Sequence, residues 1–171
     1  MLDLFARALL AVVFSAAVVG KVRSRRGLAG FRDLVAAVGP RWLPAGPVAG
    51  VVVMGEAGTV VLLAVPGMRP AGYAMAAVLL VMFCAGIARA VLAGQPVRCQ
   101  CFGAGGGLLG PRHLVRNGLL VAVAVAGAFA GGVPASAPGA LVAVVAGAFA
   151  GLLTIRWEDV AFLLVPAGRN R

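Results

Sequence analysis

The chain has 171 residues, of which 62% are hydrophobic, and fifteen lysines and arginines against five acids give it a formal charge of +10. A soluble globular domain is about 45–50% apolar, so this composition predicts a bilayer protein and excludes an ordinary soluble domain. We expect the positive charge to lie in loops against anionic lipid. Nucleic-acid binding is not expected, because the sequence offers no soluble basic face and no aromatic platform.

Five apolar segments approach the length of about 20 residues that a helix needs to cross a bilayer. They cover about residues 2–20, 43–65, 71–93, 117–133 and 139–155. The first is interpreted as a retained span rather than a signal peptide, because Asp3 and Arg7 leave its start without net positive charge and no clear cleavage site follows. The prediction is an all-α, polytopic transmembrane bundle over one domain, residues 1–171, with a four-helix core plus one further span.

The first loop contains apolar residues at helical spacing, namely Leu28, Phe31, Leu34, Val35 and Val38. Arg32 and Asp33 lie on the opposite face. This pattern predicts a short helix in the membrane surface, and Gly39-Pro40 is expected to end it.

The fourth and fifth segments resemble each other, since the sequence of residues 125–131 recurs unchanged as residues 145–151. Each copy holds a Gly-x-x-x-Gly pair, at positions 127 and 131 and at positions 147 and 151. Small residues four apart allow close helix packing in lipid. Low-complexity Ala/Gly/Val composition is the alternative explanation.

Basic residues are concentrated in the first loop, in the loop between the third and fourth segments, and in the C-terminal tail. These three regions lie on one face if the five spans alternate in direction. By the positive-inside rule that face is cytoplasmic.

Cys99 and Cys101 are the strongest candidates for chemistry, because they lie one residue apart in the longest polar gap of the chain. A turn brings such residues within disulfide reach, and strained, exposed disulfides are the labile ones. Neighbouring cations such as Arg98 and Arg116 lower the pKa of a thiol and favour thiolate. Two incidental thiols, or a soft-metal site on Cys99 and Cys101, are the alternatives.

Glu56 is the one acid deep within an apolar segment, and such acids are functional candidates by default. It could carry protons to a thiol or a quinone, or form an ion pair with Arg89. Cys84, in the third segment, is expected to behave as a small hydrophobe. His113, the single histidine, is expected to pack in the loop.

Four features of the chain together resemble the MauE proteins of methylamine utilisation, within the wider DoxX-like membrane family. They are Gly20-Lys21 at the end of the first segment, Gly55-Glu56 in the second, the run Cys99-Gln100-Cys101-Phe102-Gly103, and Arg116-Asn117 in the fourth. The resemblance covers about residues 5–125, and the cysteine run is its most specific part. The family usually has glycine between the cysteines, so Gln100 is a departure that stiffens the turn but keeps both thiols.

The resemblance implies a multi-pass cell-membrane protein that supports disulfide formation while methylamine dehydrogenase matures, with a thioredoxin-like partner or the client protein itself. Cys99 and Cys101 are then the reactive residues of a candidate thiol–disulfide oxidoreductase component, supported by Arg98, Phe102, Gly103, Arg116 and Glu56. Such chemistry places the cysteines on the extracytoplasmic face, against the positive-inside count, and we expect that face.

No cofactor is predicted, since a quinone pocket cannot be recognised in the sequence. The alternatives are a membrane protein that binds or transports a soft metal or a small molecule, and a non-catalytic membrane assembly factor.

Overall fold

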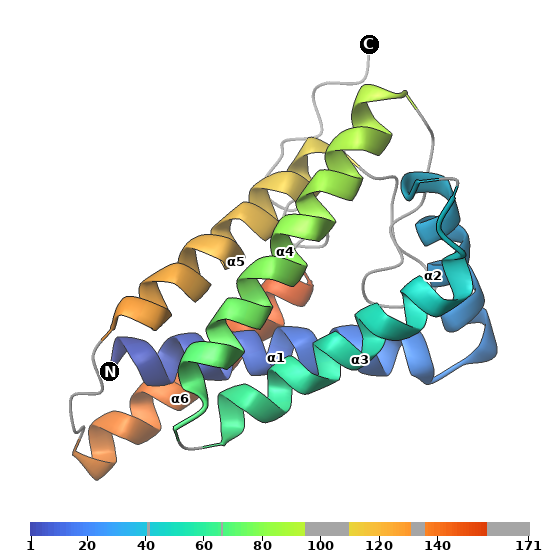
Figure 1. The fold of residues 1–171 in the computed structure, drawn as a ribbon. Coiled ribbons are helices and arrows are strands. Elements are labelled where there is room, and N and C mark those ends of the chain that lie inside the picture. The colour runs from blue at the N-terminus through green and yellow to red at the C-terminus, as the bar shows by residue number, and fades with distance from the viewer. Residues whose placement is uncertain (41, 66, 95–109, 131–135, 157–171) are drawn as a thin grey trace.

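A computed structural model describes the chain except for residues 41, 66, 95–109, 131–135 and 157–171 (Figure 1). The described residues form helices and no strand. In chain order the helices are α1 (Leu2–Val22), α2 (Arg25–Val38), α3 (Ala45–Ala64), α4 (Arg69–Leu92), α5 (Pro111–Phe129) and α6 (Ala137–Ile155). All except α2 are long and apolar enough to cross a membrane. The predicted all-α bundle, with five spans and an additional helix in the first loop, is confirmed.

The outer faces of the spans carry large apolar side chains that no other described part of the chain covers. Val51, Met54, Leu119, Leu141 and Phe149 are all more than half exposed. Exposed apolar surface of this kind marks a membrane or protein contact. The chain is therefore a multi-pass membrane protein whose outer surface faces lipid.

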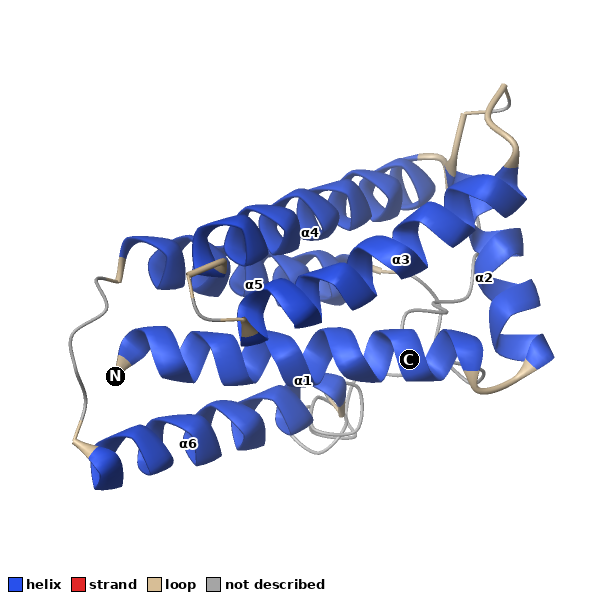
Figure 2. Ribbon diagram, turned by 60° about the horizontal axis from the view of Figure 1, so that its bottom comes forward, coloured by secondary structure: helices blue, strands red, loops and turns tan. Residues whose placement is uncertain are grey.

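The core lies where α1, α3, α4 and α5 meet. Its buried members include Leu10 and Phe14 of α1, Leu63 of α3, Leu80 of α4 and Leu120 of α5. Helix α6 packs chiefly against α1, outside this group (Figure 2). The arrangement matches the expected four-helix core plus one further span.

The repeated small residues have a packing role in both copies. A Cβ atom added at Gly147 would meet the backbone carbonyl of Phe5, and one at Gly151 would lie 3.0 Å from Cβ of Val12, so these glycines allow α6 to approach α1 closely. Gly127 of α5 receives the ring of Tyr73, which would lie 2.6 Å from an added Cβ. Close helix packing therefore explains these positions better than composition alone.

Helix α2 has the amphipathic character expected of it. Its N-cap residue Ser24 accepts a hydrogen bond from the backbone N–H of Gly27 at 3.0 Å, and the helix ends at Gly39 as predicted. Phe31 and Leu34 are buried in a second small cluster with Val52 of α3. Packing against α3 and α4 holds α2 across one end of the bundle.

The fourth apolar helix begins earlier than the segment predicted from the sequence. It runs from Pro111 to Phe129, whereas the predicted segment covers about residues 117–133. The predicted segment begins after Arg116 because Arg116 is charged. The bundle interior accommodates Arg116, which is buried, so the helix begins six residues earlier than expected.

The helices alternate in direction, so α1 ends, α3 begins, α4 ends and α5 begins toward the upper and right side of Figure 1. The first loop and the two residues that bound segment 95–109, Gly94 and Gly110, therefore belong to one end of the bundle.

Candidate functional site

The predicted cysteine site falls in a part of the chain outside the described residues. Cys99, Cys101, Arg98, Phe102 and Gly103 all belong to segment 95–109. Their assignments remain predictions. The described residues nearest to them in sequence are the end of α4 and the beginning of α5.

A buried ion pair lies within the described part of the bundle. Nζ of Lys21 donates a hydrogen bond to Oε1 of Glu56 at 2.6 Å, and the two side chains are only 1% and 0% exposed. Lys21 lies in the last turn of α1, and Glu56 lies in the middle of α3. Charges withdrawn from water to this extent are tolerated only when paired at close range.

The ion pair with Arg89, one of the possibilities for Glu56, is not the one that the described residues form. Arg89 lies in the last turn of α4 and is exposed, while Lys21 pairs with Glu56. The sequence interpretation placed Lys21 in the first loop, because the apolar segment was ended at residue 20. In the structure α1 continues to Val22, so Lys21 belongs to its last turn, and the ammonium lies inside the bundle.

Two aromatic rings also lie against the Lys21 ammonium. Its Nζ lies 4.6 Å from the ring centre of Phe31 in α2 and 5.6 Å from that of Phe83 in α4. Both distances are within the range in which a ring face attracts a cation. One ammonium group thus connects α1, α2, α3 and α4.

Helix α5 brings Arg116 and Asn117 to the same place. Both residues are buried, and they line a small cavity of about 30 Å³ together with Lys21 and Glu56. A guanidinium N–H of Arg116 donates to Oδ1 of Asn117 at 3.4 Å. A cavity of this size, with these polar groups in its lining, holds about one water molecule. We call Lys21, Glu56, Arg116 and Asn117 the buried polar centre.

The beginning of α5 is fixed by His113. Its Nδ1 accepts a hydrogen bond from the backbone N–H of Gly110 at 3.2 Å, and the ring is buried. This bond satisfies one of the backbone donors that a helix leaves free at its N-terminus. His113 therefore has a local structural role at the end of the cysteine segment.

A second polar cluster occupies the opposite end of the bundle. The hydroxyl of Tyr73 donates to Oδ1 of Asp3 at 3.0 Å, and Arg69 lies 3.4 Å from the other carboxylate oxygen. Arg7, which is 3.9 Å from the same oxygen, donates to the carbonyl of Leu63 at 2.7 Å. Arg7 thus contacts one of the last carbonyls of α3, where a cation is favoured.

Cys84 lies within α4 as a free, half-buried thiol. Among the described residues there is no group of three or more His, Cys, Asp or Glu side chains placed to hold a metal ion. The soft-metal alternative concerns Cys99 and Cys101, which lie outside those residues.

A family model described as "Methylamine utilisation protein MauE" matches residues 1–130. The chain belongs to this family. No curated protein and no solved structure matches the chain.

The MauE match ends one residue after α5, so it covers the four-helix core and α2 but not α6. Three of the four sequence features that resemble MauE proteins meet in the fold, since Lys21, Glu56 and Arg116 line one cavity. The sequence signal for Lys21 was present as the Gly20-Lys21 feature. Its role was missed because a lysine next to a span is ordinarily a topology signal.

Proposed function

We propose that this MauE-family protein supports disulfide exchange in a partner protein during methylamine utilisation, through Cys99 and Cys101. The observation that carries the proposal is the Cys99-Gln100-Cys101 pair within the region that matches the family. The name of the family supplies the metabolic setting. The partner is a client protein with thiols to oxidise, or a thioredoxin-like protein.

The proposed reaction is a two-electron exchange. A thiolate of the client attacks one sulfur of the Cys99–Cys101 disulfide, the S–S bond breaks, and a mixed disulfide forms. The second thiolate of the client then attacks the mixed disulfide. The client leaves with a disulfide, and Cys99 and Cys101 keep the two electrons and take up two protons. A thioredoxin-like protein in its disulfide form reoxidises the pair by the reverse sequence and is itself reduced.

Positive charge supports this chemistry, because it stabilises the thiolate that leaves at each step. We assign that role to Arg98, next to Cys99 in sequence, and to Arg116 on the helix that follows the cysteine segment. Phe102 and Gly103 complete the motif, and Gly103 gives the chain freedom to turn. Glu56 is assigned a supporting role in the proposed exchange, because it pairs with Lys21 in the buried polar centre.

The first experiment tests whether the two cysteines form a redox pair. The full chain, purified in detergent with Cys84→Ser to remove the third thiol, is titrated with a mild reductant, alkylated and weighed by mass spectrometry. The proposal expects zero labels before reduction and two labels after it, gained together. Two labels gained only after treatment with a chelator would show a metal site instead. A number of labels that neither the reductant nor the chelator changes would contradict both the redox pair and the metal site.

The second experiment tests the side of the membrane. We propose that the cysteine segment faces the extracytoplasmic compartment of the cell membrane, where disulfides persist. A membrane-impermeant thiol reagent, applied to intact cells after mild reduction, should label the Cys84→Ser protein. Labelling that appears only after the cells are opened would place the pair on the cytoplasmic side.

A further inference from the structure

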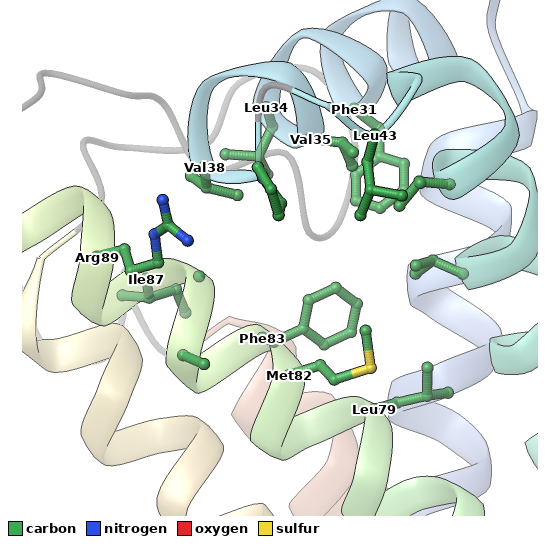
Figure 3. A pocket seen from close by; sticks show the side chains of 16 residues that line it. Phe31, Leu34, Val35, Val38, Leu43, Leu79, Met82, Phe83, Ile87 and Arg89 are labelled. Atoms are coloured by element: carbon green, nitrogen blue, oxygen red, sulfur yellow. The ribbon is translucent and has the colours of Figure 1, made fainter.

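A large apolar cavity opens between α2, α3 and α4, separate from the buried polar centre (Figure 3). Its volume is about 290 Å³. For comparison, an engineered apolar cavity of about 150 Å³ stays dry and binds benzene. The cavity is therefore large enough to admit a hydrocarbon chain.

The lining of the cavity is apolar with a single exception. Leu34 and Val38 of α2 face Met82 and Phe83 of α4 across it, and Arg89 lies at its edge. Arg89 is the one charged residue among the described residues that line the cavity. A ligand that matches this lining is hydrocarbon along most of its length and negatively charged at one end.

The position of Arg89 fits a membrane interface. It lies in the last turn of α4, and its side chain is exposed. Figure 3 shows its guanidinium on the same side of the cavity as Val38, near the end of the amphipathic helix α2. An arginine at the end of a span extends its charge toward the headgroups.

We propose that this cavity is a binding site for an anionic phospholipid. One acyl chain fills the space between α2, α3 and α4, and the headgroup phosphate accepts hydrogen bonds from the guanidinium of Arg89. The bilayer supplies this ligand at high concentration, and the charge of +10 on the chain favours anionic lipid around it. The inference does not depend on the chemistry proposed for Cys99 and Cys101.

A bound chain has a structural consequence. Phe31 and Phe83 line this cavity, and the same two rings flank the ammonium of Lys21. An acyl chain in the cavity packs against the same two rings. Lipid binding therefore holds α2 against the spans and holds both rings near the buried ion pair.

The test uses the full chain, stripped of lipid in a neutral detergent. Phosphatidylglycerol and phosphatidylcholine with identical acyl chains are titrated separately, and binding is measured by native mass spectrometry and by the rise in melting temperature. One favourable cation at the membrane surface corresponds to about a fivefold preference for the anionic lipid. Equal affinities for the two lipids would overturn the proposal.

Two matched variants test the charge. Arg89→Gln should remove the preference for phosphatidylglycerol. Arg112→Gln removes the same charge from an exposed position at the beginning of α5, outside the cavity, and should leave the preference unchanged. Equal losses in the two variants would mean that net charge alone attracts the lipid, and would contradict a site at Arg89.

Two further arms test the acyl chain. Val48→Phe fills part of the cavity and should weaken the binding of both lipids, with Ala85→Leu as a second filling variant if the first does not fold. Glycerol phosphate, which carries the charge without a chain, should not raise the melting temperature. Stabilisation by glycerol phosphate equal to that by the lipid, or unaltered lipid binding in a folded filling variant, would contradict the proposal.

Discussion

At the N-terminal end of α1, Asp3 shares its carboxylate between Arg7 and Arg69, and Arg69 remains 34% exposed. Near the C-terminal end of the same helix, Lys21 and Glu56 are paired at 2.6 Å and are almost completely withdrawn from the surface. Both clusters tie α1 to its neighbours through ions. Only at the second cluster are both members of the pair desolvated, so the loss of one partner there is far more costly. The comparison separates an accessible ionic contact from a buried polar centre that the fold requires.

The largest effect is expected from Lys21→Met. The change removes the ammonium and leaves the Glu56 carboxylate in a site built for an ion pair. Breaking a buried pair on one side costs about 3–5 kcal/mol. The free energy of unfolding, measured by circular dichroism in mixed detergent with increasing SDS, should fall by that amount. A loss below about 1 kcal/mol would mean that the pair is not desolvated.

The double variant Lys21→Met, Glu56→Met sharpens this result. The double variant replaces both members of the pair with apolar side chains of similar length, and such replacements of a buried pair are often neutral or stabilising. The double variant should therefore be more stable than Lys21→Met alone. Glu56→Met is measured alone as well. If the stability losses of Lys21→Met and Glu56→Met simply add in the double variant, the two residues are not coupled in the way that the 2.6 Å contact indicates.

An intermediate effect is expected from Gly127→Ala, which acts on the accessible cluster through packing. The added methyl group would lie 2.6 Å from the ring of Tyr73, whose hydroxyl donates to Asp3. Forcing this ring away should cost about 1–3 kcal/mol.

Gly118→Ala is the matched control for that change, because it lies on the same helix with nothing within 4 Å of the new methyl group. It should be neutral or stabilise α5 by up to about 1 kcal/mol, since alanine is the better helix former. Equal effects of the two substitutions would show that the Tyr73 contact does not matter.

The smallest effect is expected from Arg69→Gln. The change removes one of two cations near Asp3, at a position that solvent or headgroups reach. Exposed ion pairs contribute about 0–1 kcal/mol, and the same SDS titration should detect no larger loss. A loss near that of Lys21→Met would erase the distinction between the two ends of the bundle.

The spans and α2 could be predicted from the sequence because each depends on local periodicity and segment length. The beginning of α5 and the inward position of Lys21 could not, because charge was taken as the boundary of a span. A span tolerates charge where the bundle interior provides partners. Arg116 and Lys21 both meet that condition, at the buried polar centre.

The ion pair of Glu56 could not be predicted from the sequence for a different reason. Lys21 and Arg89 were both available cations, at sequence separations of 35 and 33 residues, and nothing local decides between them. The choice depends on how α1 and α4 each pack against α3, which is tertiary information. The cysteine pair is the reverse case: the chemistry proposed for it is inferred from two residue types at close spacing, and its assignment stays a prediction from sequence.

The most direct test of the thiol–disulfide account is an electron transfer measured between two proteins. The Cys84→Ser chain with Cys99 and Cys101 reduced is mixed with a thioredoxin-like protein in its disulfide form, and free thiols are counted on each by alkylation and mass spectrometry. The account predicts that two thiols are lost from Cys99 and Cys101 for every two that appear on the thioredoxin-like protein. It also predicts no transfer from the variant that additionally carries Cys99→Ser and Cys101→Ser. Absence of transfer from the intact pair, or equal transfer from the variant without it, would contradict the account.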